Sequence, residues 1–410
     1  MCIRDRFTKP ASGGLLSSIT ETPRTGFIIR ESIAMSIKHW ISTGILATAC
    51  AIASSAPQDI VIGQVGQLKD PASAASQVKV GVQLYFDAVN DRGGINGAKL
   101  KLVTKDRGPE AADSLEKTRE ILQEEKPVAL IGFSGTAPVE ALVREKVLAA
   151  AGIPLVGPRT GAVSLHEPVN PWIFHTRANY AQEVQKIVSH MGIIGHKRVA
   201  VFYEKSPFGV EGYDRALRAI KGKNLQLSGT ASYEYGTADV GEAVATILKA
   251  KPDAVISVAT SAATAEFYKN FRQGGSSAFV VALSVTDGAA VVKRIGKQAA
   301  YGLGIALVVP DPSSKTSILV REMQEDHRKY GAPGSDLTLA VTEGYIAARV
   351  LAEGLKRTGP NPTSAKIKRS LESVRDLNLG GFTVNFSPAN HSGSSYVDII
   401  VLSPDGRMLR

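Results

Sequence analysis

The feature that most constrains the fold is an alternation of short apolar segments with longer amphipathic ones. Apolar segments of this length are typical of buried strands, and the amphipathic ones are typical of helices. The expected strands of the first block are 60–63, 100–103, 128–131 and 153–156, and the expected helices are 77–90, 110–124 and 137–151. Strands that alternate with helices at this spacing predict a parallel sheet with right-handed crossovers.

The alternation starts afresh after the segment RANY, residues 177–180. The expected strands of this second block are 198–202, 225–233, 254–258, 279–282 and 302–309, and the expected helices are 181–193, 209–221, 240–250 and 262–273. Helices near 316–330, 337–357 and 363–375 follow, and strands at 381–386 and 396–402 end the chain. Two α/β blocks in a chain of 410 residues predict two lobes.

Residues 35–56 have the pattern of a secretory signal peptide. Met35 is followed by a lysine, by an apolar stretch too short to span a bilayer, and by an A-x-A cleavage pattern at residues 51–53. We therefore expect export to the periplasm, with a buried helix as the alternative interpretation of this segment. The opening letters MCIRDR resemble translated sequencing-adapter sequence, so residues 1–34 are expected to be a non-native extension.

The two cysteines, Cys2 and Cys50, both lie in this N-terminal part of the chain. The remainder therefore has no thiol for a disulfide, a cysteine nucleophile or a cysteine-ligated metal. A lipoprotein signal usually has a larger aliphatic residue three positions before its cysteine, so lipid anchoring at Cys50 is the lesser alternative. The net charge of +10 is scattered without a long basic run, which argues against a nucleic-acid partner.

The glycine-rich and histidine patterns do not match those of common enzymes. The chain has no G-x-x-x-x-G-K-[ST] phosphate loop, and the glycines of residues 93–97 follow a helix where a dinucleotide fingerprint would follow a strand. Residues 132–136, GFSGT, differ from a nucleophile elbow at Thr136, and no histidine lies in an H-E-x-x-H pattern. We expect no catalytic residue, no metal and no cofactor, with a secreted α/β hydrolase as a remote alternative.

Two polar loops each follow a predicted strand of the first block. The first loop contains Ser134, Gly135 and Thr136, and the second contains Arg159, Thr160 and Gly161. Their glycines let backbone N–H groups approach a guest, and the first loop also opens a helix whose N-terminus favours an anion. The alternative is that both loops are only turns and caps, but two of them together favour a small polar cradle for a ligand.

Several segments of the chain, in this order and spacing, resemble those of type I periplasmic solute-binding proteins of the branched-chain amino-acid family, which serve ABC transporters. The segments are FDAVNDRGGINGAKLKLV, IGFSGT, GIPLVGPRTGA, IFHTRANYAQE, RVAVFYEKSPFGVEGY, EGYIAARVLAEGLKRTGPNPT and GGFTVNFSPANHSGSSYVDIIVLSPDGR. The resemblance runs from about residue 60 to the end of the chain. It implies an α/β fold of two Rossmann-like lobes with parallel-rich sheets, joined by three crossover segments, with the ligand clamped between the lobes.

The resemblance also implies domain boundaries. Lobe 1 is expected at residues 57–178 and 311–385, and lobe 2 at residues 179–310 and 386–410. In the family, the two polar loops of the first lobe bind the carboxylate and the amino group of the ligand. The positions that match them are Ser134, Gly135, Thr136, Arg159, Thr160 and Gly161.

Positions in the second lobe are carried over in the same way. Phe208 matches an aromatic residue that covers the ligand, and Tyr203 and Lys205 lie just before it. Thr260 matches the region of a tyrosine, and Ser284 the region of an acidic residue that binds the ligand's ammonium group.

The serine at position 284 is a departure from the family pattern, because an α-amino acid would lose its charged partner there. Glu343 and Tyr180 lie near predicted crossings and are the weaker candidates to replace it, whereas Asp287 is expected to lie too far into a helix. Arg159 is also unusual. It either points inward and selects an anion through bidentate hydrogen bonds, or points to solvent at the rim.

The resemblance therefore predicts the binding protein of an ABC importer, which is not an enzyme. It would capture a small carboxylate or amino-acid-like ligand by hinge closure and deliver it to permease subunits. The loss of the acidic residue at position 284 favours a carboxylate that is not an amino acid. A periplasmic sensing domain with the same fold is the main alternative. The absence of an attached signalling domain after the last strand leads us to expect transport.

Overall fold

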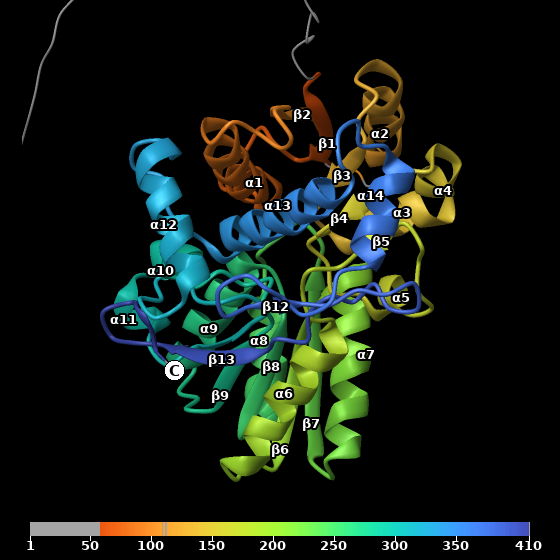
Figure 1. Cartoon of the computed structure of the whole chain (residues 1–410). Coiled ribbons are helices and arrows are strands. Elements are labelled where there is room, and N and C mark those ends of the chain that lie inside the picture. Colours follow the sequence, from red (N-terminus) through yellow and green to blue (C-terminus); the bar gives the residue numbers. More distant parts are fainter. Residues whose placement is uncertain (1–57, 109, 111–112, 410) are drawn as a thin grey trace, which may run out of the picture. The chain divides into compact units, whose positions relative to one another are not determined.

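The computed structural model describes residues 58–108, 110 and 113–409, and these residues form two large sheets covered by helices and one two-stranded sheet (Figure 1). The expected extension at residues 1–34, the signal peptide at 35–56 and the question of Cys50 lie outside the described residues. Within them, no helix is both long and apolar enough to cross a membrane.

The first sheet has the strand order β2-β1-β3-β4-β5, and all its pairs are parallel. Its strands are β1 (Ile60–Gly66), β2 (Leu100–Asp106), β3 (Ala129–Ile131), β4 (Leu155–Val156) and β5 (Ile173–Phe174). The helices of this block are α1 (Ala74–Asp91), α2 (Asp113–Glu124), α3 (Thr136–Arg144), α4 (Val147–Ala151) and α5 (Val163–His166). The central strands β3 and β4 are wholly buried, as expected for a parallel sheet covered on both faces.

The second sheet has the strand order β14-β13-β10-β9-β8-β6-β7. Strands β6 (Arg198–Lys205), β7 (Gln226–Glu234), β8 (Ala254–Val258), β9 (Phe279–Ala282) and β10 (Gly304–Leu307) are parallel, and β13 (Asp398–Leu402) and β14 (Met408–Leu409) continue it with antiparallel pairs. Its helices are α6 (Tyr180–Ile193), α7 (Pro207–Gly222), α8 (Gly241–Ala250), α9 (Ser261–Gln273), α10 (Gly288–Ile295) and α11 (Lys297–Ala300). The α/β class with parallel-rich sheets is therefore confirmed.

Between β10 and β13 the chain forms three helices, α12 (Ile318–Tyr330), α13 (Leu339–Arg357) and α14 (Ser364–Glu372). They are followed by the short hairpin of β11 (Leu377–Asn378) and β12 (Thr383–Val384). Helix α13 packs closely on α1 because a glycine of each helix faces the other backbone. A Cβ atom added at Gly81 would lie 1.9 Å from the carbonyl oxygen of Val341, and one at Gly344 would lie 2.2 Å from that of Val78. This contact joins α13 to the block that contains the first sheet.

The chain passes between the two blocks three times. We call residues 175–179, 308–317 and 385–397 the first, second and third crossovers. The first and third lie side by side, because the His175 amide donates to the carbonyl of His391 (2.9 Å) and the Gly393 amide donates to the carbonyl of His175 (2.8 Å). The expected three crossovers are therefore present, whereas the exact lobe boundaries remain predictions.

Most of the expected elements are found, and the differences have physical reasons. Strands 254–258 and 279–282 are confirmed to the residue. The helix expected at 137–151 is instead two helices, because Lys146 adopts a left-handed conformation with φ of 54°. The sequence pattern does not reveal β5 or β14, since two residues are too few to establish a period.

Candidate functional site

The two polar loops of the first block lie side by side at the carboxyl ends of β3 and β4. Ser134 and Arg159 form a parallel bridge, and the Arg159 amide donates to the carbonyl of Phe133 at 2.7 Å. The hydroxyl oxygens of Thr136 and Thr160 are 2.7 Å apart and share a hydrogen bond. The loops are therefore fixed to each other, at the sheet edge where open α/β proteins place ligands.

Helix α3 begins inside this pair of loops and has no side-chain cap. Its N-cap is Gly135, whose φ of 103° suits glycine because other residues rarely adopt it. By contrast, α6, α7 and α9 are capped by the side chains of Asn179, Ser206 and Thr260. Within the part of the chain that the structure describes, the first amides of α3 thus have no side-chain acceptor, which leaves the positive end of its dipole available to an anion.

Two aromatic rings adjoin the second loop. The Tyr180 amide donates to the carbonyl of Gly161 at 2.7 Å, and a Cβ atom at Gly161 would lie only 2.8 Å from Cδ1 of Tyr180. The Tyr180 ring in turn meets Phe208 edge to face, with 5.4 Å between ring centroids. Both rings are buried, and together they form an apolar wall beside the polar loops.

A buried set of charged side chains completes this region, and we call it the arginine–glutamate network. Its members are Arg159, Arg177, Glu183, Ser284 and Glu343. Glu343 on α13 accepts from Arg159 Nε at Oε1 and from Arg177 Nη1 at Oε2, both at 3.0 Å. Arg177 Nη2 also donates to Glu183 Oε1 at 2.7 Å and to the hydroxyl of Ser284 at 2.5 Å.

The loop after β9 closes the network. The Ser284 amide donates to Glu183 Oε2 at 2.9 Å, and Arg159 Nη2 donates to the Ser284 carbonyl at 3.2 Å. Two positive and two negative side chains are thus paired, with side-chain exposures between 0% for Glu183 and 7% for Glu343. Paired charges can be buried because each compensates the lost hydration of the other.

Burial and pairing act in opposite directions on the pKa values of this network. Burial alone lowers the pKa of Arg177, but the carboxylates of Glu343 and Glu183 outweigh it and raise that pKa above its ordinary value. Burial also raises the pKa of Glu183, opposed by Arg177 and by the hydrogen bonds from Ser284. Arg177 therefore stays charged throughout the physiological range.

The structure thus brings together ten of the thirteen residues expected at the site. They are Ser134, Gly135, Thr136, Arg159, Thr160, Gly161, Tyr180, Phe208, Ser284 and Glu343. The burial of Arg159 rules out its interpretation as a solvent-exposed rim residue. Glu343 is shared by two arginines, so it is not free to replace a missing carboxylate. Ligand binding by these residues remains a prediction.

The other three expected residues contact different partners. Tyr203 stacks on Tyr213 of α7 at a centroid distance of 4.3 Å, and Lys205 is an exposed residue whose ammonium pairs with Glu234. Thr260 caps α9, and its amide donates to the Tyr233 hydroxyl at 3.1 Å.

The position of Asp287 differs from the expected one within a helix. This aspartate is the N-cap of α10 and does not lie inside that helix. Its Oδ1 accepts from the Ala290 amide and its Oδ2 from the Leu339 amide, so both oxygens serve the fold.

Sequence reasoning missed Arg177 and Glu183, although a signal for Glu183 exists. The buried residues of α6 include Tyr180, Val184 and Ile187, which recur at helical spacing, and Glu183 lies on the same face. An acidic residue on the apolar face of a helix must have a buried partner. Arg177, six residues earlier, is that partner.

A second buried polar group lies at the first and third crossovers, and we call it the histidine cluster. Its members are His166, His175 and His391, all less than 5% exposed. The rings of His166 and His175 stack at 3.6 Å, and His175 Nε2 is 3.0 Å from the carbonyl oxygen of Leu165. Among the described residues, no hydrogen-bond partner reaches His175 Nδ1 or His166 Nε2.

These histidines are held neutral. Burial lowers the pKa of His175 to about 4, and the nearby Arg177 adds to this effect. Burial likewise lowers the pKa of His166, with a further contribution from His175. Glu372 Oε1 lies 3.3 Å from His391 Nε2, but burial outweighs its attraction and lowers the pKa of His391 as well.

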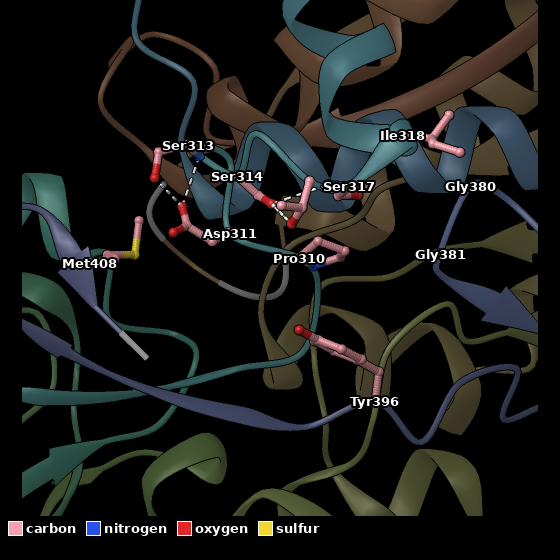
Figure 2. A pocket seen from close by; sticks show the side chains of 11 residues that line it. Pro310, Asp311, Ser313, Ser314, Ser317, Ile318, Gly380, Gly381, Tyr396 and Met408 are labelled. Atoms are coloured by element: carbon pink, nitrogen blue, oxygen red, sulfur yellow. Dashed lines mark hydrogen bonds between the residues drawn. The ribbon is translucent and has the colours of Figure 1, made fainter.

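A pocket of about 550 Å³ lies elsewhere, along the second crossover (Figure 2). Its lining includes Asp311 and Ser314 of that crossover, Tyr396 of the third crossover, and Met408 of β14. The Asp311 carboxylate already accepts hydrogen bonds from the amide and hydroxyl of Ser313, as the dashed lines in Figure 2 show. None of the residues expected at the site lines this pocket.

Comparison with known proteins yields consistent matches over the described region. Residues 59–407 match the sequence model of a family described as periplasmic binding protein. The Leu/Ile/Val-binding protein homolog 3 of Brucella melitensis is 22% identical over 366 residues, which cover 88% of this chain and 95% of that protein.

Solved structures show the same fold. A substrate-binding periplasmic protein from Ralstonia solanacearum has a TM-score of 0.81 and 36% identity, covering 86% of this chain and 99% of that one. A branched chain amino acid ABC transporter protein from Thermus thermophilus, solved with bound valine, has a TM-score of 0.78 at 19% identity, covering 86% of this chain and 95% of that one.

Proposed function

The chain belongs to the periplasmic binding protein family, and on that premise we propose that it is the substrate-binding protein of an ABC importer. It captures a small carboxylate or amino-acid-like ligand between two lobes in the periplasm and delivers it to permease subunits. The names of its relatives support this proposal, since they describe a Leu/Ile/Val-binding protein homolog and an ABC transporter protein with bound valine.

One observation supports a carboxylate as the ligand. The hydroxyl groups of Thr136 and Thr160 meet at 2.7 Å beside the uncapped N-terminus of α3. Hydroxyls and free amides at a helix N-terminus can donate hydrogen bonds, and a carboxylate is a small organic group that accepts several of them at once. The aromatic wall of Tyr180 and Phe208 would contact the apolar body of such a ligand.

Capture requires a conformational change that the ligand stabilises. The three crossovers are the connections about which two lobes would rotate, and the ligand shifts the population by binding the closed form more tightly. The closed form is the one that the permease recognises. The site performs no covalent chemistry in this account.

A thermal-shift screen tests the proposal. The purified chain is heated with amino acids, aromatic and aliphatic carboxylates, amides and sugars. A ligand present at 100 times its dissociation constant stabilises the chain by about 2.7 kcal/mol, which raises the unfolding midpoint measurably. A shift with carboxylates or amino acids supports the proposal, and no shift with any member of these two classes contradicts it.

A pair of variants then tests the location of the site. In Thr160→Val the hydroxyl shared with Thr136 is lost, and we expect the affinity for the ligand found in the screen to fall about ten-fold. The matched control is Thr264→Val, which removes another fully buried hydroxyl, bonded to that of Thr286 at 3.1 Å. Calorimetric titration should show unchanged affinity for the control, and equal losses in both variants would place the ligand elsewhere.

A further inference from the structure

All four carboxylate oxygens of the arginine–glutamate network already accept a hydrogen bond from this chain. Glu343 uses Oε1 for Arg159 and Oε2 for Arg177. Glu183 uses Oε1 for Arg177 and Oε2 for the amide of Ser284. Neither carboxylate therefore has an oxygen that is free of a donor from the protein.

Three further acidic residues lie at or after the carboxyl ends of β6 and β9, and each accepts hydrogen bonds from this chain. Glu204 accepts from the hydroxyls of Ser206 and Tyr233 at 2.7 and 2.8 Å. Glu211 pairs with an arginine on its own helix and accepts from a backbone amide of the first block at 3.1 Å. Asp287 accepts from two backbone amides. Glu204 and Asp287 thus use both oxygens within the fold, and the charge of Glu211 is compensated through Oε1 by the arginine on its helix, so none of the three is an unpaired counter-charge for an ammonium group.

The groups that remain available beside the polar loops can donate hydrogen bonds. Arg159 donates through Nε and Nη2 to the network, and within the described part of the chain no hydrogen bond occupies its Nη1. The amides at the start of α3 lack a side-chain acceptor, and the hydroxyls of Thr136 and Thr160 lie beside them. Donors without an unpaired carboxylate among these described residues favour an anion over a zwitterion.

An ammonium group brought into this region would lose its hydration without gaining a charged partner. Burial of an unpaired charge is strongly unfavourable, and the guanidinium of Arg159 would add repulsion. The position where the resemblance predicts an acidic residue is Ser284, whose hydroxyl already accepts from Arg177. The network therefore penalises the α-ammonium group of an amino acid while it leaves the carboxylate subsite intact.

From this we infer that the site, if it works as proposed above, selects small carboxylates that lack an α-ammonium group, and that Arg159 is the specificity-determining residue. The aromatic wall of Tyr180 and Phe208 favours an apolar or aromatic body on that acid. The arrangement would reject the amino acid of the same shape.

The test uses pairs of probes that differ only in the ammonium group. The affinities of the intact chain are measured by calorimetric titration for isocaproate and L-leucine, hydrocinnamate and L-phenylalanine, propionate and L-alanine, and glutarate and L-glutamate. In any pair that binds, we expect the acid without nitrogen to bind at least about ten-fold more tightly, because a charge–charge contact to the ammonium is missing.

A variant ties this selectivity to the network. Arg159→Gln removes the guanidinium and releases Oε1 of Glu343 as an acceptor, so the preference for the deaminated acid should fall by about ten-fold or more. The control is Arg349→Gln on the same helix as Glu343, which also breaks an arginine–glutamate pair, with Glu322, but lies outside the network. It should leave the preference unchanged. If the Arg159 variant does not fold, the paired affinities of the intact chain still decide the inference.

The outcomes separate this inference from the proposed function. Tighter binding of an amino acid than of its deaminated partner would overturn the inference and leave the proposed function in place. Binding of neither member of any pair at millimolar concentration would contradict both. An unchanged preference in Arg159→Gln would remove Arg159 as the determinant.

Discussion

The arginine–glutamate network and the histidine cluster are both buried, yet one is charged and the other is neutral. In the network, two arginines and two glutamates compensate one another, with every carboxylate oxygen bonded. In the cluster, burial lowers the pKa of each histidine, and one ring nitrogen of His166 and one of His175 have no hydrogen-bond partner among the described residues. The difference shows two ways of placing polar side chains in a dry interior, by pairing charges or by suppressing them.

The two groups also join different parts of the chain. The network connects the loops after β4 and β9 with α6, α13 and the first crossover. The cluster lies where the first and third crossovers are hydrogen-bonded to each other. Both groups therefore include a residue of the first crossover, Arg177 and His175, and the network in addition borders the proposed ligand site.

Removal of the carboxylate that two arginines share should cause the largest loss in the free energy of unfolding. Glu343→Gln leaves Arg159 and Arg177 without their common counter-charge in a buried setting, and we expect a loss of about 3–5 kcal/mol in the free energy of unfolding. Urea denaturation measures this loss. The control is Glu322→Gln, whose carboxylate is half exposed in its pair with Arg349 and should cost far less. Equal losses would mean that the network is not specially stabilising.

Acidification should destabilise the folded chain through the histidine cluster. The pKa of His175 is about 4 in the folded chain against an ordinary 6.5, so the unfolded chain binds more protons between these values. The stability contributed by the neutral ring is fully present above pH 6.5 and is lost as the pH falls toward 4. The shift corresponds to about 3 kcal/mol.

Urea midpoints measured across this pH range check the prediction. In the variant His175→Gln the urea midpoint should fall less as the pH is lowered, because glutamine binds no proton in this range. The control His327→Gln removes a half-buried histidine on α12 outside the cluster and should retain the full decline. An identical decline in the wild type and the His175 variant would contradict a neutral cluster.

Removal of an exposed ion pair should have the smallest effect on stability and on ligand affinity. Lys205, one of the residues expected at the site, pairs with Glu234 at the surface, and solvent screens such a pair. Lys205→Met should therefore leave both the urea midpoint and the affinity for the ligand unchanged within error. A clear loss of affinity would show that Lys205 reaches the ligand and would enlarge the site beyond the residues that the structure brings together.

The sequence pattern predicts the large features of the fold because they repeat. Strands such as 254–258 and 279–282 are continuous apolar runs between helical patterns, and their bounds are confirmed. Single residues determine the rest. The left-handed Lys146 divides one expected helix into two, and the two-residue strand β5 has no period to detect.

The site was only partly predictable, for a related reason. Small and hydroxyl-bearing residues after β3 and β4 indicate a polar cradle, and the structure shows those loops bonded to each other. The pairing of Arg159 with Glu343 joins residues 184 positions apart, and no local pattern reveals such a contact. Glu183, on the apolar face of α6, carried a detectable signal that points to a buried partner without identifying it.

A crystal structure of the chain with hydrocinnamate, or with whichever deaminated acid binds most tightly, would show where the carboxylate binds. We expect the carboxylate at the N-terminus of α3, within hydrogen-bonding distance of Thr136 or Thr160 and of Arg159, with the apolar body against Tyr180 and Phe208. An acid bound instead in the pocket along the second crossover, with the polar loops left empty, would contradict the proposed ligand site.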